Sequence, residues 1–296
     1  MPEPFFSVVI PTFNRAHLIG KTLDTFFQQT FFSFEIIVVD DGSTDNTDEV
    51  LAPYCMDSRV QYHKKKNEER GVARNYGARL AKGMYVNFFD SDDLAYPNHL
   101  EVAYGCTKKW NSPEVFHLGY DMRTPDGHRW VIKNNLPPTV NDQLINGNHL
   151  SCNGVFIRRD MAMQHPFSQD RSLSASEDYA LWLHLAARFP LHCCNTITST
   201  IIDHEARSVI NINFEKFILR MEKLQSILQS DETLMSRYHS DWPLFLSYRD
   251  IYIALHLGMA KFPKAVCLKY LWNSMKNNPS VIFSRRFYGA LKNIVL

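Results

Sequence analysis

Hydrophobic residues in the first ninety positions occur in short continuous runs that alternate with segments of helical spacing. Consecutive apolar positions predict strands that are buried on both faces, and these runs cover 6–10, 34–39, 60–63 and 85–89. Apolar residues three or four positions apart predict helices between the runs, over 18–28, 44–52 and 71–81. This alternation predicts an α/β fold with a mostly parallel central sheet flanked by helices.

The pattern changes after Pro97. A helix is expected as far as position 110, followed by strands over 115–120, 129–132 and 154–157. The Thr-Pro-Asp-Gly turn at 124–127 separates the first two of these strands, so we expect an antiparallel or mixed extension of the sheet.

The last third of the chain has helical spacing. One amphipathic helix is predicted over 178–188, and helices interrupted by prolines continue from position 213. We therefore expect an α/β domain over 1–212, with halves at 1–97 and 98–212, and a helical C-terminal extension over 213–296.

Polar residues follow three of the predicted strands at the point where each strand ends. They are Pro-Thr-Phe-Asn-Arg at 11–15, Asp-Asp-Gly-Ser at 40–43 and Asp-Ser-Asp-Asp at 90–93. Ligands of open parallel sheets bind beyond the carboxyl ends of the strands, where these segments converge. Three carboxylates in four positions are favourable around a hard divalent cation such as Mg²⁺ or Mn²⁺. A solvated acidic turn before a helix is the alternative, and the convergence of three strand ends argues against it.

Composition excludes several classes of protein. The 296 residues carry 32 basic and 31 acidic side chains, so no global positive field predicts nucleic-acid binding. The six cysteines lack CxxC spacing, which argues against a zinc ribbon and predicts reduced thiols. The N-terminus lacks the pattern of a signal peptide and no apolar run approaches about 20 residues, so a cytoplasmic location is expected.

Five motifs occur in an order that resembles inverting family 2 glycosyltransferases with the GT-A fold. The motifs are VVIPTFNR, VVDDGSTD, GVARNYGAR, FFDSDD and SEDYALWLHLA, and they span residues 5 to about 210. The resemblance implies a nucleotide-binding half over 1–97 and an acceptor-binding half over 98–212. It also implies transfer from a UDP-sugar, with Mn²⁺ or Mg²⁺, to a hydroxyl of a glycan or lipid-linked saccharide. A role in bacterial surface polysaccharide synthesis is expected only from the family resemblance, and no residue pattern in the sequence indicates it directly.

The resemblance assigns donor-side roles to the strand ends. Asp41 is suited to accept the N3–H of uracil, a bond that cytosine would not offer. The alternative is that Asp40 and Asp41 start a turn and cap the next helix, and ligand contact is favoured over it. Pro11 and Thr12 are expected to border the base. Arg74 is expected to pair with phosphate or the base edge, and a position on a solvated helix face is the alternative for it. The remaining donor-side candidates are Asn14, Arg15 and Ser91.

Side chains at alternate positions of an extended segment point the same way, so Asp90 and Asp92 can face one ligand. Asp92 is the predicted metal ligand. Asp90 is expected to contact the ribose, or the metal through water, and Asp93 to have a structural or capping role.

Asp178 is the candidate general base, with Glu177 as an acceptor-binding or orienting residue. A helix dipole stabilises an anion at this position, and an ordinary capping acid is the alternative. In the segment 202–208, His204 is a candidate for the metal or a phosphate, and Arg207 for the leaving-group charge. A lone histidine is as often a surface residue. Polar residues at 148–153 are expected on the acceptor side without a fixed role.

The tail mixes aromatic and basic residues at 264–272 and 283–292. Such helices can lie on the inner face of a cell membrane, pack on their own domain, or form a homodimer. No QxxRW-type sequence accompanies them, which argues against a processive membrane synthase. A nucleotidyltransferase, a dehydrogenase and a haloacid-dehalogenase-type phosphatase each need a different motif after the first strand. A catalytically silent sugar-nucleotide-binding or assembly protein remains the alternative from another class, and Asp178 discriminates it.

Overall fold

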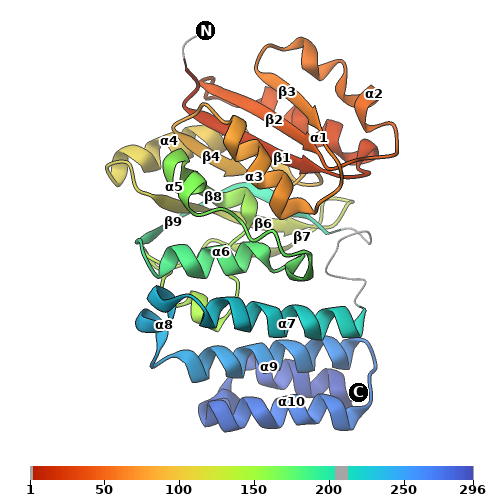
Figure 1. The fold of residues 1–296 in the computed structure, drawn as a ribbon, viewed down its shortest axis with the longest axis vertical. Helices are drawn as coiled ribbons and strands as arrows, with labels where there is room; N and C mark the ends of the chain where they lie inside the picture. The colour runs from red at the N-terminus through yellow and green to blue at the C-terminus, as the bar shows by residue number, and fades with distance from the viewer. Residues whose placement is uncertain (1–2, 204–212, 296) are drawn as a thin grey trace.

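The computed structural model describes residues 3–203 and 213–295. Within these residues one sheet has the strand order β3-β2-β1-β4-β8-β6-β9-β5, and β7 pairs with β6 (Figure 1). Its parallel part consists of β1 (Phe6–Thr12), β2 (Phe34–Asp40), β3 (Val60–Lys64) and β4 (Tyr85–Phe88). All seven residues of β1 and all seven of β2 are buried. The predicted parallel sheet of strands buried on both faces is confirmed.

Each face of the parallel sheet packs in its own hydrophobic cluster. Val8 belongs to the cluster on one face and Val9 to the cluster on the other, as alternation along a strand requires. Gly77 allows a close approach of helix to strand, because a Cβ there would lie 2.3 Å from Val9 Cγ1. The helices of this half are α1 (Ala16–Phe27), α3 (Arg70–Leu80) and α4 (His99–Lys109).

The second helix begins later than predicted. The sequence favoured 44–52, whereas α2 spans Thr47–Leu51 and is followed by the short helix η1 (Tyr54–Met56). Asp45 explains the shift, because its Oδ1 accepts hydrogen bonds from the backbone and hydroxyl of Thr47 at 3.2 and 2.6 Å. Its Oδ2 accepts from the backbone of Ala16 at 3.1 Å. The segment before α2 is therefore a loop tied to the start of α1.

The second half of the sheet is mixed, as predicted. β8 runs antiparallel to both β4 and β6, and β6 runs parallel to β9. The strands here are β5 (Leu94–Ala95), β6 (Val115–Arg123), β7 (Arg129–Lys133), β8 (Val155–Arg158) and β9 (Leu191–Ile202). The short helices between them are η2 (Leu144–Asn146), η3 (Cys152–Gly154), α5 (Arg159–Gln164) and η4 (Arg171–Leu173), followed by α6 (Glu177–Ala186).

The sequence analysis did not predict β9, the longest strand. Its sequence, LHCCNTITSTII, contains Asn, Thr and Ser in place of an apolar run, and its central residues Asn195 and Thr196 are exposed. β-branched residues at 196–202 carry the strand signal instead. β9 matters for function because it ends beside the Asp90–Asp93 segment.

The tail forms successive helical layers beneath α6, as Figure 1 shows for α7, α9 and α10. The hydrophobic core is continuous from Trp182 of α6 through Leu224 of α7 to Phe245 of α9. The tail consists of α7 (Phe214–Gln229), α8 (Glu232–Tyr238), α9 (Trp242–Met259), α10 (Lys264–Asn277), η5 (Pro279–Phe283) and α11 (Arg285–Val295). The helical nature predicted for this region is confirmed.

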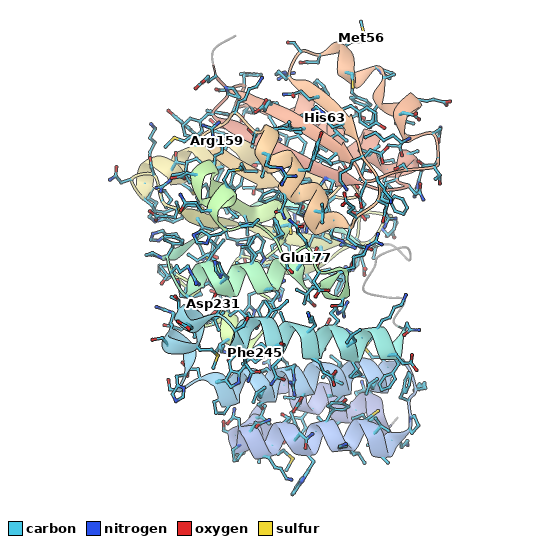
Figure 2. All side chains as sticks on the ribbon, viewed as in Figure 1. Met56, His63, Arg159, Glu177, Asp231 and Phe245 are labelled. Carbon is cyan, nitrogen blue, oxygen red and sulfur yellow. The ribbon has the colours of Figure 1, made fainter. Side chains whose placement is uncertain are left out.

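Asp231 ties α6 to the tail (Figure 2). It caps α8 by accepting from the backbone of Leu234 at 3.1 Å, and it accepts from both terminal nitrogens of Arg188 at 2.7 and 2.9 Å. His184 Nδ1 lies 2.6 Å from its Oδ2. Burial alone would raise the pKa of Asp231, but these hydrogen bonds lower it to about 2. The Asp231 carboxylate is therefore ionised at neutral pH and keeps its ion pair with Arg188.

In the described part of the chain, no helix combines sufficient length with sufficient apolar character to cross a membrane.

Candidate functional site

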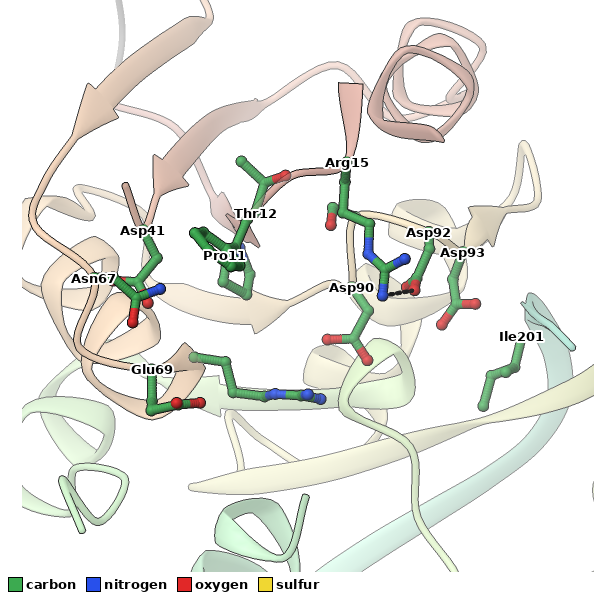
Figure 3. A pocket seen from close by; sticks show the side chains of 13 residues that line it. Pro11, Thr12, Arg15, Asp41, Asn67, Glu69, Asp90, Asp92, Asp93 and Ile201 are labelled. Carbon is green, nitrogen blue, oxygen red and sulfur yellow. Dashed lines mark ion pairs between the residues drawn. The ribbon is translucent and has the colours of Figure 1, made fainter. Parts of the chain in front are cut away.

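The three polar strand ends meet around one cavity of about 340 Å³ (Figure 3). The convergence predicted from the sequence is therefore observed, and Arg70 and Ile201 join it from α3 and β9. The cavity is lined by Pro11, Thr12, Phe13, Arg15, Asp41, Asn67, Glu69, Arg70, Asp90, Ser91, Asp92, Asp93 and Ile201.

The loops after β1 and β2 hold each other in place. Asn14 adopts a left-handed backbone conformation with φ 52°, its backbone donates to Ser43 Oγ at 2.9 Å, and its side-chain oxygen accepts from the backbone of Thr44 at 2.8 Å. Asn14 does not appear among the lining residues. Asn14 therefore positions the loop that carries the lining residues Thr12, Phe13 and Arg15.

Thr12 and Asp41 form one end of the cavity. Thr12 is 3% exposed, and its hydroxyl has no hydrogen-bond partner in the part of the chain that the structure describes. Asp41 Oδ1 accepts from Lys65 Nζ at 2.7 Å and from the backbone of Glu68 at 3.0 Å. A carboxylate has about four acceptor sites, so Asp41 retains capacity for a ligand donor.

Asp40 has a different role from its neighbour. It is completely buried, its Oδ1 accepts from the backbone of Ser43 at 2.7 Å, and its Oδ2 accepts from the Tyr62 hydroxyl at 2.7 Å. Asp40 therefore fixes the turn, and Asp41 is the carboxylate that faces the cavity.

The Asp90–Asp93 segment forms the opposite end. Asp92 Oδ2 lies 3.7 Å from Arg15 Nη2, the ion pair drawn in Figure 3. Asp93 is buried, and its carboxylate accepts from Asn153 Nδ2 at 2.7 Å and from the backbone of Ile202 at 2.9 Å. Burial, and then the charges of Asp92 and Asp90, raise the pKa of Asp93 well above its usual range. Asp93 therefore joins the acidic segment to β9, which is a structural role. Its side chain does not cap α4.

The donor set suits a cation that shares its coordination with a ligand. Among residues 3–203 and 213–295, no group of three His, Cys, Asp or Glu side chains lies close enough to hold a metal ion. Mg²⁺ and Mn²⁺ at phosphate sites use one or two carboxylates together with substrate oxygens. Asp92, whose carboxylate borders the cavity, fits that arrangement, with Asp90 on the same wall. His204 and Arg207 lie outside the described residues.

Arg74 occupies a position that the sequence did not predict. Its side chain is 1% exposed, with Nη1 donating to Glu177 Oε1 at 2.8 Å and Nη2 donating to Asp90 Oδ1 at 2.7 Å. The sequence analysis expected Arg74 to contact a phosphate or the base edge, and in the structure both of its terminal nitrogens bind carboxylates. Arg74 instead links the acidic segment after β4 to the start of α6.

Glu177 is the buried partner of Arg74. It is 4% exposed, and its second oxygen, Oε2, has no hydrogen-bond partner within the described residues. Arg70 Nε lies 3.7 Å from Glu177 Oε1, one helical turn before Arg74 on α3. Figure 2 shows Glu177 between the α/β layer and the helical layer. Its burial and its pairing with two arginines suit the orienting role among those expected for it. Arg70 was not predicted from the sequence. Its spacing of four positions from Arg74 is the pattern that could have identified it, because residues at i and i+4 lie on the same face of a helix.

Asp178 borders a second cavity of about 550 Å³, which shares Arg70, Asp90 and Ile201 with the first. Its carboxylate accepts from Asn148 Nδ2 at 2.9 Å and from the backbone of Tyr179 at 2.7 Å. Burial, and then the charge of Glu177, raise the pKa of Asp178 to about 6. A carboxylate with this pKa is ionised at neutral pH and is still basic enough to accept a proton.

The sequence assigned no specific role to Asn148, although it placed the segment 148–153 on the acceptor side. The hydrogen bond to Asp178 gives Asn148 a positioning role, and it also lowers the pKa of that carboxyl. Asn153 lies on the other side of the same segment, where it accepts from the backbone of Asp90 at 2.9 Å and donates to Asp93. Spacing alone does not reveal these two partners, because they lie 30 and more positions away.

The sequence model described as "Glycosyl transferase family 2" matches residues 7–155, half of the chain. The chain belongs to glycosyl transferase family 2. The matched region contains the polar ends of β1, β2 and β4, and it ends before Asp178.

An uncharacterized glycosyltransferase from Rickettsia felis is 28% identical over 228 residues, which cover 72% of this chain and 37% of that relative. The chain thus spans little more than a third of the length of this relative.

Two solved structures share the fold. S. aureus TarS 1–349 in complex with UDP-GlcNAc has a TM-score of 0.64 at 18% identity, over 95% of this chain and 91% of that one. The mannosyltransferase PcManGT from Pyrobaculum calidifontis, in complex with GDP-Man and Mn²⁺, has a TM-score of 0.58 at 14% identity, over 99% and 86%. The fold of this family 2 member is the predicted GT-A fold, with helices at its C-terminus.

The buried bridge through Arg74 generates a prediction about stability. Replacing Arg74 with Met should lower the free energy of unfolding by about 3–5 kcal/mol, because Glu177 would remain buried without its cation. Urea denaturation measures this change. Arg79→Met is the matched control on the same helix, since Arg79 is exposed and its loss should cost less than about 1 kcal/mol. Equal effects of the two substitutions would contradict the structural importance of the bridge.

Proposed function

We propose that the chain is an inverting, metal-dependent glycosyltransferase that moves a sugar from a UDP-sugar to a hydroxyl of a glycan or lipid-linked acceptor. The observation that carries the proposal is the junction of the two cavities. One contains Asp41 and Asp92, the other contains Asp178 with its raised pKa, and Arg70 and Asp90 line both. A donor in the first cavity would present its reacting carbon toward the base in the second.

Uracil is the base that this donor cavity suits. Asp41 can accept the N3–H of uracil while Lys65 and the backbone of Glu68 hold its carboxylate in place. The hydroxyl of Thr12 on the same wall offers a further polar contact. The complexes of TarS with UDP-GlcNAc and of PcManGT with GDP-Man and Mn²⁺ support a nucleotide-sugar donor and a divalent cation here.

Charge at the other end of the cavity suits a diphosphate. A divalent cation held by Asp92 would supply positive charge that stabilises the departing diphosphate. Arg15 and Arg70 line the same cavity, so their side chains add positive charge near the diphosphate. Asp90 is oriented by Arg74, so it keeps a fixed position beside the donor.

The transfer step itself is a single displacement. Asp178 accepts the proton of the acceptor hydroxyl as that oxygen attacks the anomeric carbon, and the bond from this carbon to the diphosphate oxygen breaks with its electron pair. Asn148 holds the carboxylate in position for the proton. An α-linked donor then gives a β-linked product. Synthesis of a bacterial surface polysaccharide is the setting that we propose for this reaction.

A donor screen tests the proposal. With Mn²⁺ present, one UDP-sugar should bind to the wild type in calorimetry, and Asp92→Ala should weaken that binding. Asp178→Asn should keep donor binding and lose about 10²–10⁴-fold in the rate of UDP release, since only the base is removed. Its fold should persist, because the substitution removes a partly buried charge.

Other results of this screen separate the alternatives. A wild type that binds the donor and never releases UDP with any acceptor would support a catalytically silent binding or assembly protein. Undiminished turnover by Asp178→Asn would remove Asp178 from the mechanism, and NMR of a product with retained configuration would overturn single displacement.

The pKa of Asp178 predicts the pH dependence of the reaction. The base must be ionised, so the rate should reach a plateau above about pH 6 and fall about tenfold per pH unit below it. Asn148→Ala removes a hydrogen bond that lowers this pKa, and it should move the midpoint to higher pH. Gln143→Ala, at an exposed site before the same loop, should leave it unchanged. An acidic limb that is identical in all three proteins would contradict Asp178 as the titrating base.

The helical tail supports a proposal about location, a peripheral contact with an anionic membrane surface. All 31 acidic residues precede position 251, whereas seven Lys and Arg residues follow it. Five hydrophobic residues of α10, η5 and α11 are also exposed, and they are Leu268, Trp272, Phe283, Tyr288 and Val295. Basic helices with exposed aromatic residues bind anionic lipid headgroups and insert their apolar side chains at the interface.

Vesicle sedimentation tests this contact. The protein should sediment with vesicles that contain phosphatidylglycerol, less so at high salt, and little with phosphatidylcholine alone. Replacing both Trp272 and Phe283 with Ser should reduce sedimentation. Phe32→Ser is the control, because Phe32 is 73% exposed on the α/β domain. Equal loss with the control, or no preference for anionic vesicles, would exclude the tail as a membrane contact.

A further inference from the structure

The cavity beside Asp178 is built by two parts of the chain. The catalytic part contributes the segment from Ile145 to Cys152 and the start of α6, and the tail contributes side chains from α7, α9 and α11. Figure 2 shows Phe245 in the helical tail and Glu177 above it, nearer the α/β layer. The tail residues that line the cavity are Met221, Leu224, Phe245, Tyr248, Arg249, Ile251, Tyr252, Leu255 and Arg286. The helical extension therefore forms one wall of the proposed acceptor site.

Arg286 of α11 reaches across this cavity to the catalytic part. Its Nη1 donates to the backbone oxygen of Asn146, 140 positions earlier in the chain, and its guanidinium lies 5.2 Å from the centre of the Tyr248 ring. Gly147 makes room for this contact, because a Cβ there would lie 3.0 Å from Arg286 Nη1 and its φ is 136°. The position of the guanidinium is thus determined by a carbonyl on one side and an aromatic ring on the other.

Arg286 has no carboxylate partner in the part of the chain that the structure describes, and residues 251–296 contain no Asp or Glu. The other three arginines that line the cavity lie close to carboxylates: Arg249 Nη2 is 2.6 Å from Asp250 Oδ1, Arg74 binds Asp90 and Glu177, and Arg70 Nε is 3.7 Å from Glu177 Oε1. One end of the cavity is therefore acidic and the other carries a single exposed cation.

The two ends lie close together along one loop. Arg286 binds the carbonyl of Asn146, and Asn148, two residues later, binds Asp178. Two residues span at most about 7 Å of chain, which is comparable to the length of one or two sugar rings. Tyr248 and Tyr252 lie one helical turn apart on α9, and both offer aromatic surface to the same cavity.

From this geometry we infer that Arg286, supported by Tyr248, binds an anionic group of the acceptor while a hydroxyl of the same acceptor meets Asp178. A guanidinium has five donors in a planar fork, and it binds carboxylate or phosphate oxygens through paired, charge-assisted hydrogen bonds. The substrate class is therefore a saccharide that carries a phosphate or a carboxylate next to the reacting sugar. The inference rests on the proposed transferase function, and it makes the tail a specificity element of that reaction.

Small sugars test the inference without a known acceptor. The probes are methyl glucoside, methyl glucoside 6-phosphate and methyl glucuronide, titrated into the full chain with UDP and Mn²⁺ at low salt and followed by NMR. The wild type should bind at least one anionic sugar about tenfold more tightly than the neutral one. A preference for the phosphate indicates a phosphate-linked acceptor, and a preference for the glucuronide indicates an acidic sugar. No preference over the neutral sugar overturns the inference.

Variants assign the preference to one side chain. Arg286→Gln should abolish the preference and Arg286→Lys should retain part of it, because lysine keeps the charge and loses the fork. Arg285→Gln is the matched control, since it removes the same charge from the adjacent position and does not line the cavity. Equal losses in Arg285→Gln and Arg286→Gln would indicate a general electrostatic effect and overturn the site.

Donor binding separates this inference from the proposed function. Arg285→Gln should bind and hydrolyse the UDP-sugar at the wild-type rate, because Arg285 lines neither cavity. A wild type that fails to bind any UDP-sugar contradicts the transferase proposal. A wild type that binds the donor and ignores the charge of the sugar probes contradicts only the role of Arg286.

Discussion

The buried ion pairs of Arg74 are the interaction on which the site depends. One guanidinium binds Asp90, after β4, and Glu177, at the start of α6, at 2.7 and 2.8 Å. These carboxylates come from positions 87 residues apart, and both border the cavity in which we place the acceptor. A buried charge without a partner is strongly unfavourable, so neither half of the site can shift without a large loss of free energy. The bridge thus fixes the cavity proposed for the donor relative to the candidate base.

The same bridge affects the chemistry of Asp178. Glu177 and Asp178 are adjacent carboxylates in the first turn of α6, and the charge of Glu177 raises the pKa of Asp178. Arg74 acts in the opposite direction and lowers it. Without the guanidinium, two neighbouring acids at a partly buried position would favour protonation of one of them. The arrangement leaves Asp178 with a pKa of about 6, above that of an ordinary aspartate and below neutral pH.

Much of this site could be predicted from the sequence, because local patterns report local structure. The apolar runs located β1, β2, β3 and β4, and the polar residues at their ends identified Asp41, Asp90 and Asp92 at the cavity. The partners of those residues could not be predicted, since Arg74 to Glu177 and Arg286 to Asn146 join positions more than 100 residues apart. The helical pattern around an arginine does not show whether its guanidinium is solvated or buried, because that depends on carboxylates from distant parts of the chain. β9 was missed for a different reason, because its strand propensity lies in Thr and Ile between polar residues.

The charge asymmetry of the tail supports two separate proposals, one for the acceptor site and one for a membrane contact. Residues 251–296 contain seven basic and no acidic residues, so every cation there must find a carboxylate elsewhere or remain uncompensated. Arg286 is turned toward the catalytic part by the carbonyl of Asn146 and the ring of Tyr248, whereas its neighbour Arg285 does not line the cavity. Adjacent positions on a helix differ by about 100° in direction, so two neighbouring arginines can serve a cavity and an outer surface. A saccharide attached through a phosphate to a lipid would meet both features, with its anion at Arg286 and its carrier at the basic outer surface of α10 and α11.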